Sequence, residues 1–429
     1  MSSPASAERS DPGSRRDRAV LIAARTARGF GAGTLSIVLA LDLPRAGYSS
    51  LWVGLILGLA LGGGSAWALA VPWLERRWRR RSVLGVGALA LAAGGALLWL
   101  DLANPWAVLA ALLLGGIVTG GSDVGPLGVL EQAALTGTVS PSGRTRAFVW
   151  YNLLGYAGNA AGALFAGPIS SLPLAAPGAF APGVHDVALA LYGLLGLALV
   201  PVYRSLSSDV DRDGRRERPT ALSPQSRPVV FALAGLFAVD AFGGGLILNS
   251  LVVYYFSVRF GPPVGELDAI FFAANLAAAL SLVLADPLAR RFGLINTMVF
   301  THIPSNVLLT LVAFSPSLGI AALFWVGRAT LSQMDVPTRQ SYTQAIVPRE
   351  DRAAAAGYTT AARSGQAFGG PVTGVFLAAG GPWLGAPFVV AGVVKIGYDL
   401  AVYGRFRRLR PPEERIVPGP DPVRPGRPR

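Results

Sequence analysis

About a dozen apolar stretches, each near 20 residues long, follow one another along this chain, and short polar linkers separate them. A helix of about 20 residues is roughly 30 Å long, which matches the hydrocarbon core of a bilayer. Arginine is concentrated in every second linker, and such alternation sets the orientation of membrane helices. The pattern predicts an all-α membrane protein that moves or senses something across a bilayer.

The apolar stretches predict twelve membrane-spanning helices. Their expected bounds are 19–41, 50–71, 82–101, 106–130, 145–168, 185–204, 228–257, 266–289, 294–315, 317–343, 353–379 and 384–404. The longest break is rich in Asp and Arg and has no apolar face, which is typical of a disordered linker. The chain should therefore divide into a tail (1–18), a six-helix bundle (19–204), a cytoplasmic linker (205–227), a second six-helix bundle (228–406) and a disordered tail (407–429).

Composition excludes several classes of function. Only 14% of the residues are charged, whereas a soluble protein carries about 25%. The net charge of +13 sits in linkers beside the membrane, so we expect it to contact lipid head groups and not nucleic acid. The chain has no cysteine and two distant histidines, His185 and His302, which argues against a metal site or a cofactor. Without a nucleotide-binding loop or a catalytic constellation, we expect neither an enzyme nor an ATP-driven pump.

The basic residues also predict the topology. Nearly all of them lie in the two tails and in the linkers after spans 2, 4, 6, 8 and 10, whereas the other linkers hold Arg45 and Arg259. Basic linkers stay on the cytoplasmic side. We therefore expect a multi-pass protein of the cytoplasmic membrane, monomeric, with both termini in the cytoplasm.

The two predicted bundles share sequence features. Matched positions are Gln132 with Gln340, Arg144 with Arg352, and Gly162 with Gly370. These matches favour an internal duplication, and hence two pseudo-symmetric bundles.

Four segments resemble the major facilitator superfamily of secondary transporters. The superfamily signature after span 2 has an acidic residue followed by a basic run, and similar runs lie at 74–81 and 286–293. The segment 369–374 resembles the Gly-Pro motif of proton-coupled drug antiporters, although it lies in span 11 and not in span 5. The segment 332–342 is similar to a stretch in bacterial members. The resemblance implies a twelve-span transporter that works by alternating access.

Charged side chains inside the spans are the candidates for the transport pathway, because each costs roughly 2.5 to 3.5 kcal/mol to insert. Span 10 places Arg328, Ser332, Asp335, Arg339 and Tyr342 on one polar stripe. In the superfamily, spans 1, 4, 7 and 10 line the cavity, which adds Arg25, Arg28, Asp123 and Asp240. Arg363 in span 11 lies deep enough to need a partner. We expect Asp240 or Asp123 to take protons, and Arg328 to balance them or to bind an anionic group.

Charged residues at the cytoplasmic ends of the spans are candidates for an inner gate, closed by ion pairs that break when the bundles separate. They are Glu75, Arg76, Asp286, Arg290, Arg291, Arg144 and Arg352. The alternative is that the basic residues only hold their loops in the cytoplasm.

Three local patterns have simpler interpretations. Lys395 and Asp399 are four residues apart, which favours an ion pair within one helix. His302 is expected to be a structural histidine. Pro126 and Pro337 each remove a helical hydrogen bond, which produces a kink or frees a carbonyl group to bind a ligand.

The leading hypothesis is a secondary active transporter that moves a small organic solute by proton-coupled efflux. One alternative is an uncoupled facilitator or an importer of the same fold. The other is a membrane sensor that transports nothing, although the central linker and the tails offer no folded signalling domain.

Overall fold

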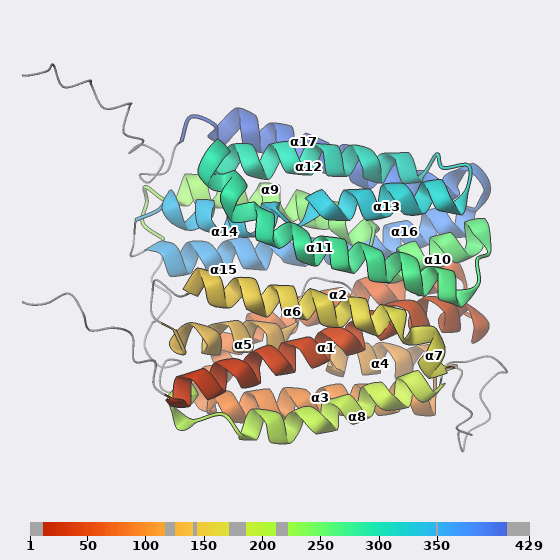
Figure 1. The fold of residues 1–429 in the computed structure, drawn as a ribbon, viewed down its shortest axis with the longest axis horizontal. Coiled ribbons are helices and arrows are strands. Elements are labelled where there is room, and N and C mark those ends of the chain that lie inside the picture. Colours follow the sequence, from red (N-terminus) through yellow and green to blue (C-terminus); the bar gives the residue numbers. More distant parts are fainter. Residues whose placement is uncertain are drawn as a thin grey trace, which may run out of the picture.

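The computed structural model describes residues 12–115, 125–139, 144–170, 186–211, 222–348 and 351–409. These residues form helices and no strands. Figure 1 shows the helices running side by side in two groups, α1 to α8 below and α9 to α17 above. Because α1 begins and α17 ends on the same side, that side is called the arginine-rich end and the other the far end. The predicted all-α fold with two bundles is confirmed.

The first bundle is packed through glycines. Its helices are α1 (Pro12–Arg45), α2 (Ser50–Arg77), α3 (Arg80–Leu100), α4 (Pro105–Gly115), α5 (Pro126–Gly137), α6 (Arg144–Leu164), α7 (Ala166–Ser170) and α8 (Asp186–Arg204). A Cβ atom on Gly33 would lie 2.0 Å from the carbonyl oxygen of Asn159, and one on Gly162 would lie 1.9 Å from that of Phe30. Helices α1 and α6 can therefore approach this closely only with glycine at these positions.

The second bundle repeats this packing. Its helices are α9 (Arg227–Leu246), α10 (Asn249–Phe260), α11 (Val264–Phe292), α12 (Leu294–Val312), α13 (Leu318–Ser332), α14 (Asp335–Ala345), α15 (Arg352–Ala362), η5 (Arg363–Phe368), α16 (Gly369–Ala379), η6 (Gly381–Gly385) and α17 (Ala386–Phe406). A Cβ atom on Gly245 in α9 would lie 1.9 Å from the carbonyl oxygen of Gln366 in η5. The contact parallels that of Gly33 with Asn159, as expected from an internal repeat.

Several of the predicted spans are interrupted helices. Within the described residues, six helical stretches are long and apolar enough to cross a bilayer. Span 7, however, breaks at Ile247 and Leu248 between α9 and α10, span 10 breaks at Gln333 and Met334 between α13 and α14, and span 11 contains the 3-10 turn η5. Interrupted helices leave backbone groups free to bind ligands at mid-membrane.

The two prolines singled out in the sequence, Pro126 and Pro337, lie at the starts of helices. Pro126 is the first residue of α5, and Pro337 lies in the first turn of α14. In a first turn the missing N–H has no partner to lose, so proline is well tolerated there. Pro337 cannot donate a hydrogen bond to the carbonyl of Gln333, and span 10 is interrupted at Gln333 and Met334, so the predicted disturbance takes the form of a helix break.

The two bundles contact one another toward the far end. A Cβ atom on Gly54 of α2 would lie 2.5 Å from the Cα atom of Gly374 of α16, so these helices are in backbone contact. The Ser50 hydroxyl lies 2.8 Å from the Tyr254 hydroxyl, between α2 and α10. The Gly167 N–H of α7 donates to the carboxylate of Asp268 in α11 at 2.9 Å. The bundles are thus held together at the start of α2 and of α11.

The expected linker is ordered at both of its ends. Residues 208–211 form the 3-10 helix η2 (Ser208–Asp211), and Arg81 Nε donates to the Asp211 carboxylate at 2.9 Å. The Ser207 N–H donates to Asp17 at 2.9 Å, from the part of α1 that extends into the expected tail 1–18. The expectation of disorder is wrong for residues 205–211, because partly buried polar contacts hold them in place. Residues 1–11, 212–221 and 410–429 lie outside the described part of the chain.

The other end of the linker is held by Asp351. The Ser223 N–H and hydroxyl donate to its two carboxylate oxygens at 3.0 and 2.5 Å. These hydrogen bonds and one from Ser226 lower the pKa of Asp351 below its ordinary value. Because the folded-state pKa is lowered, the stabilisation is present at neutral pH and is lost as the pH falls through that value.

We expect Asp351→Asn to loosen residues 222–227 and to raise their cleavage by proteinase K severalfold at neutral pH. The amide keeps the shape but cannot accept two charge-assisted hydrogen bonds. Limited proteolysis of the purified protein, followed by mass spectrometry, measures the rate. Asp101→Asn, in the loop after α3, is the matched control. Equal cleavage in Asp351→Asn and wild type would contradict this assignment.

Candidate functional site

A carboxylate shared by two cations lies within the second bundle. Asp240 of α9 accepts a hydrogen bond from Arg339 of α14 at 3.0 Å and one from Lys395 of α17 at 2.5 Å. All three side chains are buried, and Asp240 is only 7% exposed. Since each member comes from a different helix, any relative movement of these helices changes the charges around Asp240.

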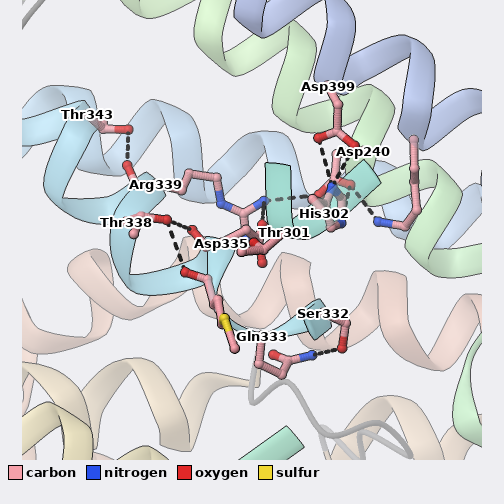
Figure 2. A network of polar contacts seen from close by, with 12 residues as sticks. Asp240, Thr301, His302, Ser332, Gln333, Asp335, Thr338, Arg339, Thr343 and Asp399 are labelled. Carbon is pink, nitrogen blue, oxygen red and sulfur yellow. Dashed lines mark hydrogen bonds and ion pairs between the residues drawn. The ribbon is translucent and has the colours of Figure 1, made fainter. Parts of the chain in front are cut away.

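A histidine and a second carboxylate extend this cluster. His302 Nδ1 of α12 lies 2.8 Å from Asp399 Oδ1 of α17, and its Nε2 lies 4.0 Å from Asp240 Oδ1. Figure 2 shows the imidazole beside both carboxylates. Asn306 donates to Asp399 at 3.2 Å. These groups make a continuous polar chain from α9 to α17, and the Asp240 cluster is defined here as Asp240, Arg339, Lys395, His302 and Asp399.

The predicted ion pair between Lys395 and Asp399 is wrong. Although the two residues are one turn apart on α17, Lys395 bonds to Asp240 and Asp399 bonds to His302. Partners on facing helices are available to both side chains, and a buried charge is stabilised most by a partner that also supplies a hydrogen bond. His302 is satisfied by Asp399, as expected of a structural histidine, but it also adjoins Asp240.

The predicted polar stripe of span 10 is divided by the helix break. Ser332 ends α13, and Asp335 begins α14, where its carboxylate lies 3.4 Å from Arg339. The Tyr342 hydroxyl donates to the Leu409 carbonyl at 3.0 Å, at the arginine-rich end. Arg328 lies over the Trp325 ring, 4.7 Å from its centre. Asp335 therefore borders the Asp240 cluster through Arg339, whereas Tyr342 lies away from it.

The first bundle holds a matching cluster around a residue that the sequence did not single out. Glu131 of α5 is fully buried and accepts hydrogen bonds from both Nε and a terminal nitrogen of Arg28 in α1. The hydroxyls of Tyr151 and Tyr203 donate to the same carboxylate. The Glu131 cluster is defined here as Arg28, Glu131, Tyr151 and Tyr203. Arg28 is thereby neutralised inside the first bundle.

The internal repeat is the signal that could have found Glu131. Gln132 matches Gln340 in sequence, so Glu131 matches Arg339. Each bundle therefore joins its first span to its fourth by a buried ion pair, Arg28 with Glu131 in one and Asp240 with Arg339 in the other. The positive and negative partners are exchanged between the bundles.

The two bundles also contact one another at the break of span 10. The Tyr156 hydroxyl of α6 donates to the side-chain amide oxygen, Oε1, of Gln333 at 2.6 Å, at the break of span 10. Arg25 of α1 lies 5.7 Å from the centre of the Tyr151 ring, and Arg363 begins η5. The pathway candidates of α1, α13 and η5 thus surround a contact between the bundles.

The gate candidates lie at the arginine-rich end of their helices. Glu75 pairs with Arg80 at 2.5 Å within the first bundle, and Arg291 lies over the neighbouring Phe292 ring. Arg290 is in the last turn of α11. The others are placed by backbone only: Arg76 and Asp286 near the ends of α2 and α11, and Arg144 and Arg352 at the starts of α6 and α15. Asp123 lies outside the described residues.

The described residues contain no group of three or more His, Asp or Glu side chains able to hold a metal ion.

The family model of the Major Facilitator Superfamily matches residues 21–363. The chain belongs to the major facilitator superfamily. Membership in this superfamily makes it a multi-pass membrane transporter and not an enzyme.

Other comparisons agree with this membership. An uncharacterised membrane protein of Saccharomyces cerevisiae, YJR124C, is 24% identical over 91% of this chain and 94% of its own length. Two solved structures have the same fold as this chain at low sequence identity. The nucleoside transporter NupG has a TM-score of 0.69 at 13% identity, over 91% of this chain and 99% of its own. A D-xylose-proton symporter has a TM-score of 0.68 at 14% identity, over 89% and 96%.

Proposed function

We propose that the protein is a secondary active transporter that moves a small organic solute across the cytoplasmic membrane by alternating access, coupled to protons, in the direction of efflux. The Asp240 cluster is the observation that carries the proposal. A buried carboxylate with cations from two other helices is costly to assemble, and such residues within a membrane mark ion and substrate pathways.

The cluster offers a way to couple protons to movement. A carboxylate that loses a cationic neighbour binds a proton more readily, and one that regains it releases the proton. Arg339 follows the break at Gln333 and Met334, so α14 can shift relative to α13 without bending a continuous helix. His302 connects Asp240 with Asp399 and provides a second group that can exchange the proton.

The contacts between the bundles support alternating access. The contacts at Ser50, Gly54 and Gly167 join the bundles toward the far end. If the arginine-rich end is cytoplasmic, as the distribution of basic residues predicts, this conformation is closed toward the outside. The gate candidates at the arginine-rich end would then form their contacts in the opposite conformation.

The kind of solute and its coupling are also supported by relatives of the same fold. One transports nucleosides, and another moves D-xylose with protons. The Gly-Pro segment at 369–374, which resembles an antiporter motif, packs against α2 at the contact between the bundles. An uncoupled facilitator is the second candidate, because the two cations on Asp240 also suit a purely structural ion pair.

Proton flux in proteoliposomes tests the proposal. The purified protein is reconstituted with a pH-sensitive dye in the lumen, and solutes are added outside in turn. Entry of a solute in exchange for protons raises the luminal pH, entry together with protons lowers it, and uncoupled entry leaves it unchanged. We expect a rise that a protonophore abolishes. Solute entry without any pH change would favour the facilitator.

A further inference from the structure

Two arginines near the contact between the bundles form no salt bridge with any carboxylate that the structure describes. Glu131 pairs with an arginine, and Asp240 pairs with an arginine and a lysine, as described above. Neither Arg328 nor Arg363, by contrast, has a carboxylate oxygen within 4.0 Å in the parts of the chain that the structure describes. The Nε atom of Arg328 is buried and has no hydrogen-bond acceptor among those same residues.

These two arginines share the same electrostatic partners. Both interact electrostatically with the Tyr156 hydroxyl and with Asp240. Tyr156 itself interacts with three guanidinium groups and one carboxylate, namely Arg25, Arg328, Arg363 and Asp335. Because Tyr156 belongs to the first bundle and bonds to Gln333 of the second, this region lies between the bundles.

Two further side chains near these arginines, Gln366 and Trp325, offer a hydrogen-bond donor and an aromatic ring. Gln366 follows Arg363 by three residues in η5, and in a 3-10 helix such residues lie on the same face. Its Nε2 atom is buried and has no acceptor among the described residues. Trp325 lies beneath the Arg328 guanidinium and holds it in place by a cation–π contact.

A guanidinium group without an ion pair raises the free energy of the folded protein in a region of low dielectric constant, unless a negatively charged group binds to it. A guanidinium presents parallel N–H donors whose spacing fits a carboxylate or a phosphate. Arg328 and Arg363 come from α13 and η5, next to two helix breaks, so both can reposition around a bound group.

We propose that the transported solute is a small organic anion, whose carboxylate or phosphate group binds Arg328 and Arg363 between the bundles. This inference rests on the proposed function, which leaves the solute class open. The anion takes the place of the carboxylates that these arginines lack, while Tyr156, Gln333 and Gln366 supply neutral hydrogen bonds to the rest of the molecule. The Asp240 cluster stays a separate, proton-exchanging element.

Binding to the purified protein tests the solute class without requiring transport. Thermal stability in detergent is measured with benzoate, citrate and phenyl phosphate, with the neutral analogues benzamide and phenol, and with the cation benzylamine. We expect at least one anion to stabilise the wild type and its neutral analogue not to do so. Arg328→Gln and Arg363→Gln should each weaken that binding at least tenfold. Arg259→Gln, which removes an exposed arginine of α10, should leave it unchanged.

Several outcomes would overturn the inference: no stabilisation by any anion, equal stabilisation by the neutral analogue or the cation, or equal binding of the anion by both glutamine variants and the wild type. If a glutamine variant fails to fold, the comparison of charged and neutral probes on the wild type still decides, together with Arg328→Lys and Arg363→Lys. Carboxylate and phosphate probes separate the two head groups. Anion binding without transport would sink the proposed function alone, and transport of neutral solutes alone would sink this inference alone.

Discussion

Glu131→Ala is expected to lower the free energy of unfolding by about 3 to 5 kcal/mol, the usual cost of removing one partner of a buried ion pair. The carboxylate of Glu131 is fully buried and accepts hydrogen bonds from Arg28, Tyr151 and Tyr203. Its removal leaves a buried guanidinium and two buried hydroxyls without their acceptor.

The measurement is the midpoint of thermal unfolding in one detergent. Glu266→Gln, at an exposed position in the first turn of α11, is the control and should shift the midpoint little. A double variant, Arg28→Met with Glu131→Ala, should recover much of the loss, because no uncompensated charge then remains. A midpoint for Glu131→Ala equal to that of Glu266→Gln would contradict the cluster.

Asp240→Asn is expected to abolish solute-driven proton flux. An amide has the shape of the carboxylate but cannot take up a proton, and it no longer neutralises Arg339 and Lys395. Downhill movement of the solute should persist more than the proton flux, because in this proposal the solute binds elsewhere. The luminal pH assay in proteoliposomes measures the first quantity, and the solute itself measures the second.

A loss of stability must be separated from a loss of coupling. The variant Asp240→Asn with Lys395→Met removes one of the stranded cations, so it should regain stability but not proton flux. Asp101→Asn, in the loop after α3, is the control for reconstitution. Wild-type proton flux in Asp240→Asn would exclude Asp240 from the coupling mechanism.

The sequence predicted the fold well because each membrane span can be recognised independently of the others. Each apolar stretch is long enough to be recognised by itself, and the arginine-rich linkers orient them without any knowledge of contacts. Pro337 indicated a lost hydrogen bond in span 10, but the complete breaks at Gln333 and Met334, and at Ile247 and Leu248, were not predicted. Tertiary contacts determine where these spans are interrupted.

The site was predicted less well, because partners come from distant parts of the chain. The sequence singled out Arg28 and Asp240 as costly buried charges, but not that Glu131 neutralises one and Lys395 the other. Lys395 had a carboxylate one turn away in Asp399, and local spacing favoured that wrong pair. Only the packing of α9 and α12 against α17 shows that each side chain faces a different helix.

A reversible cross-link at the far end tests the central claim, that the bundles must separate there for transport. The chain contains no cysteine, so Ser50→Cys with Tyr254→Cys introduces a single reactive pair at a contact between α2 and α10. We expect a short bifunctional thiosulfonate to stop solute and proton flux in proteoliposomes, and a reductant to restore both, while each single-cysteine variant stays active. Undiminished flux through fully cross-linked protein would contradict alternating access in this chain.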